Sequence, residues 1–429
     1  MSRLKSRLKV AGALAVAMAM LSGCAPATES DDGNVTLRLW TFDQGNADYI
    51  EEAIQTYLKD NPHITVEFQG YPDADYVRVL TTAWASDSGN APDLALIKAY
   101  GVVQSFIDNG NLQKLNPADF PELELFDRQA LDGVSDRSTG DLYGIPFTIV
   151  TGEIYYNTDI FDELGLTVPE TYEDLLAMSE KIKKTTEYVP IVWPSGETVH
   201  GAQAADVLMN ARRGGGGWQD RYIHGETDAL DADFVGGLEV IKEMSQYTVE
   251  HPQTVTREDA LALFASGKAA MYINGPWQIS QIRRANSEIN FASFDMPASP
   301  SWPSPTVKPG ASDGGVTMSA KTKHPEEAKK LLNWLTTNEP QSIYVNISGK
   351  LPARTDVVLK DPVSQQVFDN YLDHGTTQFF TVYTRYGVPS GTDLISEAAQ
   401  RMFLGATPTE AAKVFQDGID AWFVPMKRN

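Results

Sequence analysis

Hydrophobic residues in the first quarter of the chain switch between a strand-like and a helix-like spacing. Apolar and polar residues alternate over 35–40, which predicts a strand, and apolar residues recur every three or four positions over 50–58, which predicts a helix. Alternation returns over 64–68, a second helical spacing covers 76–84, and a strand-like run follows at 93–97. Strand, helix and strand in this order predict a parallel sheet with right-handed crossovers.

A second α/β unit begins further along the chain. A helix is predicted over 171–184, because Thr171 and Asp174 resemble a helix N-cap and apolar residues continue at helical spacing. A strand is predicted at 190–193. Residues 297–309 contain five prolines, too many for a helix or a central strand, so they predict a long surface loop.

The N-terminus has a different pattern, in which four basic residues precede an apolar run and the only cysteine of the chain follows it. The run covers 10–21, and a helix of that length would span about 18 Å, short of a bilayer core of about 30 Å. The pattern predicts a secretory signal peptide over residues 1–23. Leu21-Ser22-Gly23-Cys24 resembles the lipobox of bacterial lipoproteins, which implies cleavage before Cys24 and its acylation. Residues 24–34 would then be a lipidated, flexible tether on the extracytoplasmic face of the cell membrane.

The charge of the chain excludes several classes of partner. Residues 1–23 hold four positive charges and no negative ones, so their removal changes the net charge from −22 to −26. Such a surface repels nucleic acid, and no basic cluster longer than a pair lies outside the predicted signal. The 406 residues that remain exceed the usual size of one hydrophobic core, which predicts two domains.

No motif in the chain requires catalysis, a cofactor or a metal. The glycine run 214–217 lacks the Lys-Ser/Thr of a phosphate-binding loop, and the six histidines have no metal-ligand spacing. There is no Gly-x-Ser-x-Gly nucleophile motif, and 57 carboxylates bring many Asp and Glu pairs together by chance. We therefore expect no catalytic residue, no metal site, no cofactor and no enzymatic activity.

One segment stands out from these patterns, ALALFASGKAAMYINGPWQI at residues 260–279. It predicts a helix that ends at Gly267, a strand over 269–273 and a turn, Asn274-Gly275-Pro276, that displays the indole of Trp277. A tryptophan at such a place can equally belong to the core. The amino-acid sequence of this segment resembles the signature of bacterial extracellular solute-binding proteins of family 1, the sugar-binding proteins of ABC importers. In maltodextrin-binding protein, the tryptophan that resembles this one stacks on sugar.

Further motifs resemble the same family in the same order along residues 35–429. They are LRLWTF, APDLALI, LYGIPFTIVTGEIYYNTDIFDELGL and the segment from Ser312 to Arg354. The resemblance implies an α/β fold of two lobes, of the periplasmic-binding-protein type II, with a ligand cleft between them. Three hinge crossings would join the lobes, near 145–150, 312–317 and 349–354. One lobe would contain 35–147 and 316–350, and the other 148–315 and 351–429.

Candidate site residues follow the predicted strands, because ligands of open α/β sheets lie beyond the carboxyl ends of the strands. A sugar ring presents an apolar face and a rim of hydroxyls, which aromatic and polar side chains match. Trp277 is the expected stacking platform, and Asn274 is expected to orient its turn. The other expected substrate-binding residues are Trp40, Phe42, Asp43, Tyr100, Trp193, Ser195, Asp313, Gly314, Tyr383, Arg385, Tyr386 and Asp393.

The sequence and its family resemblance thus predict a lipid-anchored, monomeric binding protein. It would capture a carbohydrate, specifically an oligosaccharide, and deliver it to an ABC permease. Phe42 and Gln44 stand near positions where maltodextrin-binding protein uses polar and acidic groups, so the resemblance does not extend to maltodextrin specificity. Two alternatives stay open. One is a secreted glycan hydrolase, and the other is a binding protein for a polyamine, a peptide or a metal chelate.

Overall fold

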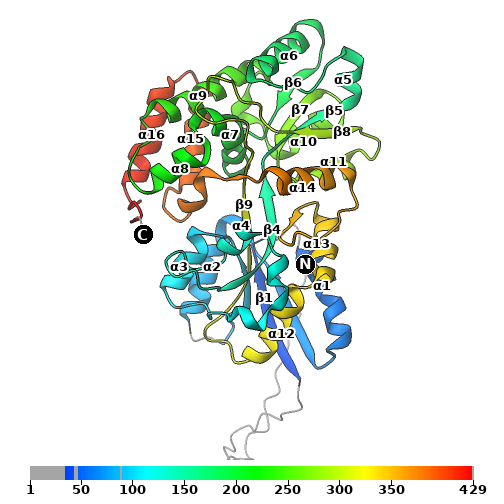
Figure 1. The fold of residues 1–429 in the computed structure, drawn as a ribbon, viewed down its shortest axis with the longest axis vertical. Coiled ribbons are helices and arrows are strands. Elements are labelled where there is room, and N and C mark those ends of the chain that lie inside the picture. The colour runs from blue at the N-terminus through cyan, green and yellow to red at the C-terminus, as the bar shows by residue number, and fades with distance from the viewer. Residues whose placement is uncertain (1–33, 43–46, 87–88, 428–429) are drawn as a thin grey trace, which may run out of the picture. The chain divides into compact units, whose positions relative to one another are not determined.

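The computed structural model describes residues 34–42, 47–86 and 89–427 (Figure 1). The predicted signal peptide, the lipidation site Cys24 and the site candidate Asp43 lie outside the described residues. The chain from Val35 onward forms one unit by its internal contacts, and it contains two β-sheets.

The first sheet has seven strands in the order β10-β4-β9-β3-β1-β2, with β11 paired to β9. Its strands are β1 (Val35–Thr41), β2 (Ile64–Gly70), β3 (Leu94–Ile97), β4 (Gly144–Thr151), β9 (Pro309–Met318), β10 (Leu351–Pro352) and β11 (Thr377–Gln378). β1 pairs parallel with β2 and β3, as the alternating patterns predict, whereas β9 runs antiparallel to β3 and β4. Leu37, Leu39 and Thr41 are fully buried while Arg38 and Trp40 between them are not, so one face of β1 packs on the core.

The second sheet has four strands in the order β6-β7-β5-β8. These are β5 (Glu153–Asn157), β6 (Val189–Val192), β7 (Ala269–Asn274) and β8 (Phe291–Phe294). β6 pairs parallel with β7, and β5 runs antiparallel to both β7 and β8. Every residue of β7 is buried, which requires cover on both faces of the sheet and explains its apolar run from Ala269 to Ile273.

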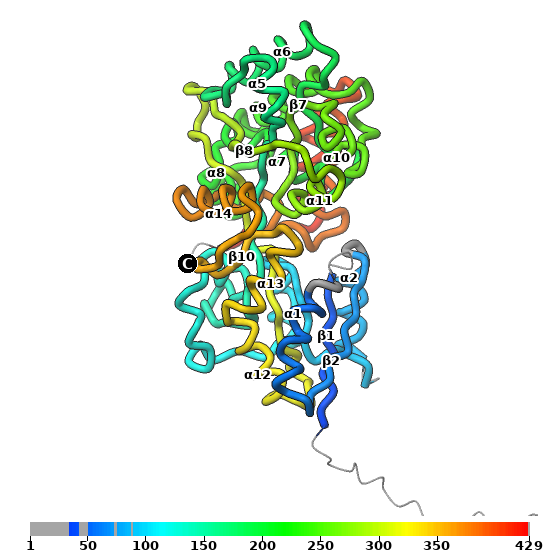
Figure 2. The backbone as a smooth tube through the Cα atoms, turned by 90° about the vertical axis from the view of Figure 1, so that its right-hand side faces the viewer, coloured from blue at the N-terminus to red at the C-terminus, as the bar shows by residue number. Residues whose placement is uncertain are grey.

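Helices cover both sheets. They are α1 (Ala47–Asp60), α2 (Asp73–Ala85), α3 (Gly101–Asp108), α4 (Arg128–Asp132), α5 (Thr158–Leu164), α6 (Tyr172–Thr185), α7 (Thr198–Arg213), α8 (Gly215–Ile223), α9 (Ala232–Met244), α10 (Arg257–Ala265), α11 (Trp277–Ala285), α12 (Pro325–Leu335), α13 (Asn338–Ser348), α14 (Pro362–His374), α15 (Gly391–Phe403) and α16 (Pro408–Asp420). In the second sheet's layer, α7, α9, α15 and α16 pack on one another (Figure 1). On the first sheet, α1 packs on α13 and α12 contacts β1 and β4 (Figure 2).

Two local predictions are confirmed. Thr171 and Asp174 form the predicted capping box of α6: the Thr171 hydroxyl accepts the Asp174 N–H at 3.1 Å, and the Asp174 carboxylate accepts the Thr171 N–H at 3.1 Å. No helix or strand lies between Phe294 and Pro309, so the proline-rich segment is a loop up to Lys308, as its composition predicts, and its last residue, Pro309, begins β9.

The three hinge crossings near 145–150, 312–317 and 349–354 stay a prediction, and the strand order shows two places where the chain changes sheet. It leaves the first sheet at Gly152, between β4 and β5, and returns just before Pro309 at the start of β9. After β10 it runs through α14 and pairs with the first sheet again at β11. β4 and β9 lie whole in the first sheet, so they extend past the predicted lobe boundaries at 147 and 316; the division into lobes at these residues stays a prediction.

A buried ion cluster lies beside two of these crossings. The ammonium of Lys308 is 3.1 Å from a carboxylate oxygen of Glu153 and 3.1 Å from one of Asp295. Lys308 and Glu153 are almost fully buried, and the amide of Asn370 donates to Asp295 at 3.3 Å. Burial raises the pKa of Glu153 to about 7, although the charge of Lys308 opposes that rise. Glu153 therefore binds a proton more tightly in the folded chain than in the unfolded chain.

This proton should make stability fall with rising pH between the two pKa values of Glu153. Between its ordinary value of 4.5 and about 7, the folded state binds more proton than the unfolded state, so the free energy of unfolding decreases as pH rises. We expect the wild type to lose on the order of 3 kcal/mol more than Glu153→Gln over this interval. Urea unfolding of both proteins at pH 4.5, 6 and 7.5 measures the difference. Parallel pH profiles for the two proteins would show that Glu153 keeps its ordinary pKa.

Candidate functional site

An aromatic cluster joins three of the predicted site residues. The rings of Tyr100 and Tyr383 meet edge to face with their centroids 5.6 Å apart. Both contact a small apolar group, to which Trp277 also packs. That group consists of Ala99, Val150, Ala311, Phe379 and Val382. Tyr100 follows β3 and Trp277 follows β7, so the cluster collects residues from the carboxyl ends of strands in both sheets, as predicted.

Tyr100 is held in a strained backbone conformation. Its φ is +60°, and no other described non-glycine residue has a positive φ. Its N–H donates to the carbonyl of Gly133 at 2.8 Å, and its hydroxyl donates to the carbonyl of Gln129 at 3.2 Å. Burial raises the pKa of Tyr100 above its usual value, so the hydroxyl stays protonated. Strain of this kind persists where the surrounding structure fixes a residue, and it is concentrated at functional sites.

Trp277 begins α11, and its indole lies over the backbone of Gly275. A Cβ on Gly275 would come within 2.1 Å of two ring carbons, so only glycine allows this packing. The ring is half-buried, and its centroid is 6.1 Å from that of His200 on α7. The indole N–H is buried and has no hydrogen-bond partner. A buried donor without a partner is costly, and an oxygen of a ligand would satisfy it.

The turn that carries Trp277 is fixed by Asn274. Its side-chain oxygen accepts the N–H of Gly275 at 2.9 Å, and its amide donates to the hydroxyl of Tyr272 at 2.7 Å. On the neighbouring helix, the carboxylate of Glu197 lies 3.0 Å from the ring nitrogen of His200. This hydrogen bond is the main reason why the pKa of Glu197 is lowered. The indole therefore lies on a rigid support.

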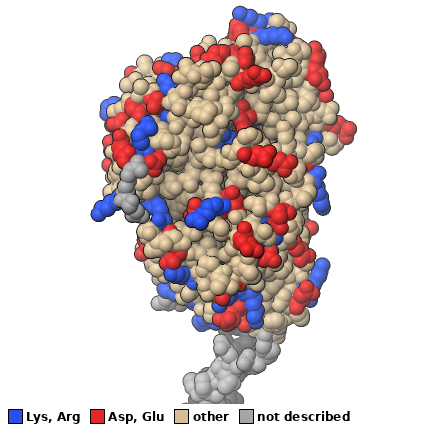
Figure 3. All heavy atoms as spheres, viewed as in Figure 1, with Lys and Arg blue, Asp and Glu red and all other residues tan. Residues whose placement is uncertain are grey.

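A cavity of about 330 Å³ opens beside the aromatic cluster, and Tyr100 and Tyr383 form part of its wall. The rest of its lining is polar: Gln104, Arg128, Asp132, Ser135, Asp136, Arg137, Gly140 and Gln378. Its formal charges cancel, because it has two arginines and two aspartates. On the face seen in Figure 3, acidic and basic side chains are likewise interspersed and no continuous basic area is present. Aromatic walls with polar groups around them are typical of small-molecule sites.

Both aspartates of this cavity have partners. Asp132 pairs with Arg128 at 2.9 Å. Asp136 accepts hydrogen bonds from the N–H and the hydroxyl of Ser138 and from the N–H of Thr139. Burial by itself would raise the pKa of Asp136, but these hydrogen bonds hold it below its usual value. The hydrogen bonds to Asp136 therefore favour its ionised form.

Other predicted site residues make contacts within the core or with helix ends. Trp40 packs on Tyr71 with ring centroids 4.9 Å apart. The Phe42 ring is 7% exposed, and the ammonium of Lys98 lies 5.0 Å from its centroid. Trp193 is 2% exposed and packs on Phe403 in the core beside the second sheet. These aromatic rings pack on hydrophobic cores and do not join the aromatic cluster of Tyr100, Tyr383 and Trp277.

The polar candidates Ser195, Asp393 and Asp313 form hydrogen bonds or ion pairs with other residues of the chain. The Ser195 hydroxyl donates to the carbonyl of Pro252 at 2.5 Å. Asp393 closes the capping box of α15 with Ser390, its carboxylate accepting the Ser390 N–H at 2.8 Å. The Asp313 carboxylate pairs with the ammonium of Lys350 at 2.9 Å.

The remaining candidates are Gly314 in β9 and two residues that follow a 3₁₀ turn, Arg385 and Tyr386. Gly314 has a φ of +139°, and a Cβ there would be 2.0 Å from the carbonyl oxygen of Ile97, so its role is to let β9 approach β3. Tyr386 is 49% exposed, and a Cβ on Gly101 would lie 3.1 Å from its ring, which places it against the start of α3. Arg385 is half-buried.

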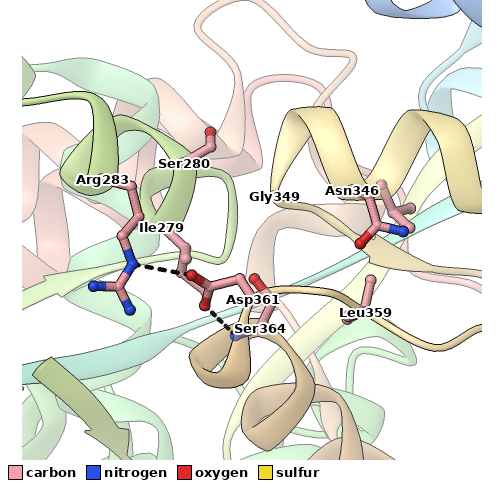
Figure 4. A pocket seen from close by; sticks show the side chains of 9 residues that line it. Ile279, Ser280, Arg283, Asn346, Gly349, Leu359, Asp361 and Ser364 are labelled. Atoms are coloured by element: carbon pink, nitrogen blue, oxygen red, sulfur yellow. Dashed lines mark hydrogen bonds and ion pairs between the residues drawn. The ribbon is translucent and has the colours of Figure 1, made fainter. Parts of the chain in front are cut away.

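A second cavity, of about 200 Å³, lies where α11, α13 and α14 come together. Figure 4 shows Arg283 and Asp361 pointing toward each other across it, with the ion pair closed at 3.0 Å. The same carboxylate accepts the N–H of Ser364 at the start of α14. The polar groups of this cavity therefore largely satisfy one another, and its walls contain no aromatic ring.

Sequence reasoning missed most of the polar wall of the larger cavity. The missed residues come from α3, from α4, from the turn at 135–140 and from β11. α4 is a five-residue helix, too short to give a periodic signal. Among the described residues, no group of three or more His, Cys, Asp or Glu could hold a metal ion. None of the described helices has the length and apolar character needed to cross a bilayer.

Comparison with solved structures gives the same fold. The chain superposes on the apo-form of RafE from Streptococcus pneumoniae with a TM-score of 0.75 at 20% identity, covering 90% of this chain and 98% of that one. RafE in complex with raffinose gives 0.77 at 20% identity, over 90% and 99% of the two chains. A chitin oligosaccharide binding protein also gives 0.77 at 20% identity, over 90% and 98%. The predicted α/β fold of the periplasmic-binding-protein type is thereby confirmed.

Sequence comparison places the chain in a family. It is 24% identical to the multiple sugar-binding protein of Streptococcus mutans over 98% of both chains. It is 25% identical to the maltodextrin-binding protein MdxE of Bacillus subtilis, over 76% of this chain and 75% of that one. The family model of bacterial extracellular solute-binding proteins matches residues 44–342, more than half of the chain. The chain therefore belongs to the bacterial extracellular solute-binding protein family.

Proposed function

We propose that this protein captures an oligosaccharide outside the cytoplasm and delivers it, as a monomer, to the membrane permease of an ABC importer. The observation that carries the proposal is the aromatic cluster of Tyr100, Tyr383 and Trp277 beside a polar cavity of about 330 Å³. The names of related proteins, which mention multiple sugars, maltodextrin, raffinose and chitin oligosaccharide, support the same class of ligand.

The chemistry of the cluster suits a sugar. Aromatic rings cover the apolar face of a pyranose, and the surrounding hydroxyls need donors and acceptors in fixed places. The unpartnered indole N–H of Trp277 supplies one donor, and the side chains of Gln104 and Gln378 line the cavity as amides able to both donate and accept. The groups that a neutral sugar requires are therefore present in the aromatic cluster and in the cavity beside it.

A cationic or metal-bearing ligand fits this cavity less well. A polyamine needs uncompensated carboxylates, whereas the two aspartates here are balanced by two arginines. Asp132 is already paired to Arg128, and Asp136 is occupied by hydrogen bonds within its own turn. The charge balance of the wall favours a neutral ligand.

The same two carboxylates argue against a hydrolase at this site. A glycosidase needs one carboxylic acid with a raised pKa to protonate the leaving group, and a second carboxylate to act as base or nucleophile. The pKa of Asp136 is lowered, not raised, and Asp132 is in an ion pair. We propose that the protein binds its ligand without turnover.

A thermal-shift screen tests the ligand class. Raffinose, maltotriose, chitotriose, monosaccharides, spermidine, amino acids and divalent metal ions are added to the purified protein at the same concentration. A ligand at 100 times its Kd adds about 2.7 kcal/mol to stability, which raises Tm by several degrees. We expect a rise with at least one oligosaccharide and none with spermidine or metals. A rise with spermidine or a metal alone would overturn the carbohydrate assignment, and release of reducing sugar from a bound oligosaccharide would establish a hydrolase.

We further propose that the protein is held at the extracytoplasmic face of the cell membrane by acylation of Cys24 after removal of residues 1–23. The pattern of basic residues, apolar run and Leu-Ser-Gly-Cys supports this proposal. Cys24→Ser should move the protein from the membrane fraction to the soluble or secreted fraction and abolish labelling with a radioactive fatty acid. Ala25→Ser, which leaves the cysteine in place, is the control. Full membrane retention of Cys24→Ser would refute lipid anchoring.

A further inference from the structure

The segment Thr377–Tyr383 carries one wall of the proposed site. It includes β11, which pairs with the start of β9, and it supplies Phe379 and Val382 to the apolar group and Tyr383 to the aromatic cluster. The regular structure of this segment is short, the two residues of β11 and one 3₁₀ turn, Phe380–Tyr383. The position of Tyr383 therefore depends on contacts made by the segment with its neighbours.

Helix α7 supplies these contacts from one face. Asp206, Asn210 and Arg213 follow at intervals of four and three residues, so they lie on the same side of the helix. The Asp206 carboxylate accepts the N–H of Phe380 at 2.7 Å, and the Asn210 amide donates to the Thr377 hydroxyl at 2.8 Å.

Arg213 completes the arrangement. Its guanidinium donates to Asp206 at 2.5 Å and to the side-chain oxygen of Asn210 at 3.2 Å. It also lies 4.7 Å from the ring centroid of Phe380. From α8, the amide of Gln219 donates to the carbonyl of Phe379 at 3.1 Å. Side chains of α7 and α8 thus hold the segment by its backbone, by a hydroxyl and by a ring.

The ion pair in this arrangement is fully buried. The side chain of Arg213 is 0% exposed and that of Asp206 is 4% exposed. Desolvation of two charges cancels much of their attraction, so a pair of apolar side chains would stabilise the core about as well. Apolar side chains, however, could not accept the hydrogen bond from the N–H of Phe380, which fixes the backbone of the segment at Asp206. The pair therefore contributes to the placement of the segment more than to the stability of the core.

We propose that Asp206 and Arg213 are positioning residues of the binding site, which hold the segment Thr377–Tyr383 on α7 and thereby keep Tyr383 against Tyr100. α7 also carries His200 in its first turn, beside Trp277. One helix thus supports two of the three aromatic rings of the cluster. The statement that this placement serves ligand binding rests on the proposed function, whereas the placement itself follows from the contacts of α7 and α8 with the segment.

The test combines a ligand-free measurement with a binding measurement. The double variant Asp206→Asn/Arg213→Gln removes both charges and avoids leaving one buried ion alone. Gln219→Leu removes only the hydrogen bond to Phe379. Glu243→Gln is the control, because Glu243 lies on α9 and accepts its hydrogen bond from Tyr172 on α6, not from the segment. Hydrogen exchange of the backbone amides is followed by mass spectrometry, with the buried strand β7 as the reference for global unfolding.

We expect amide exchange over 379–384 to accelerate at least tenfold in the double variant and less in Gln219→Leu, with β7 unchanged. The signal of 3-fluorotyrosine at position 383, assigned by its loss in Tyr383→Phe, should shift in the double variant and not in Glu243→Gln. Unchanged exchange over 379–384, or equal acceleration there and in β7, would overturn the positioning role.

The binding arm titrates raffinose, maltotriose and chitotriose into each protein. Any of these sugars that the wild type binds should bind the double variant at least tenfold more weakly and Glu243→Gln with unchanged affinity. Equal affinity in the double variant, despite faster exchange over 379–384, would overturn the link between this segment and the ligand. If the wild type binds none of the three sugars, the proposed function loses its support while the exchange data still decide the positioning role.

Discussion

Replacing Trp277 by alanine should weaken binding of the oligosaccharide by about 2–4 kcal/mol, or roughly 30- to 1000-fold in Kd. The indole contributes twice, by its ring in the aromatic cluster and by a buried N–H without a partner in the chain. A large aromatic side chain that is already fixed by its neighbours loses little conformational entropy on binding, which is why such residues dominate binding energies. Isothermal titration calorimetry with the sugar found by the thermal-shift screen measures the loss.

Two further variants separate these contributions. Trp277→Phe keeps an aromatic ring and removes the N–H, so its loss of affinity should lie between those of the wild type and Trp277→Ala. Trp302→Ala is the control, because Trp302 is also a half-buried tryptophan. It lies in the proline-rich loop and packs on Tyr172 of α6, with ring centroids 4.7 Å apart. Its removal should leave Kd unchanged. Wild-type affinity in a folded Trp277→Ala protein would show that the ligand binds away from the aromatic cluster.

The parts of the fold that depend on local sequence could be predicted. Alternation in β1 and β2 and helical spacing in α6 reflect burial of one face of each element, which one sequence window records. The antiparallel pairing of β9 with β3 and β4 could not be predicted from spacing, because it joins residues more than 150 positions apart. Only the family resemblance gave positions for the three crossings, and these positions stay a prediction.

The candidate site divides in a similar way. Tyr100 and Trp277 follow buried strands, so topology alone places them at carboxyl ends where ligands bind. Trp193 also follows a strand, yet it is buried in the core, where it packs on Phe403 at the end of α15. Asp393 is of a residue type that often binds sugar hydroxyls, but its carboxylate is used in the capping box of α15. Residue type and strand position therefore predict where a side chain starts but not which neighbour it meets.

The charged wall of the larger cavity had no such signal at all. Arg128 and Asp132 lie on the short helix α4, and Arg137 lies in an irregular turn. Their convergence with Gln378 results from the pairing of β11 with β9, a contact between segments far apart in the chain. Residues of this kind can be found only when the tertiary structure is known.

Gly314→Ala should lower the free energy of unfolding by more than about 4 kcal/mol, the range reached only when a substitution disrupts the backbone or the core. Two causes act together at this residue. Its φ of +139° disfavours any residue with a Cβ, and that Cβ would lie 2.0 Å from the carbonyl oxygen of Ile97. No side chain can move to relieve a contact with a backbone oxygen, so β9 would have to separate from β3.

The matched control is Gly217→Ala on α8. A Cβ on Gly217 meets nothing within 4 Å and the residue has no positive φ, so alanine there should raise stability by roughly 0.5–1 kcal/mol through better helix propensity. Urea unfolding followed by circular dichroism measures both variants against the wild type. A loss below about 1 kcal/mol for Gly314→Ala would mean that β3 and β9 separate easily at this point. Gly314 lies three residues after Ala311, which belongs to the apolar group of the aromatic cluster, so a large loss would show that this part of β9 is held rigidly against β3.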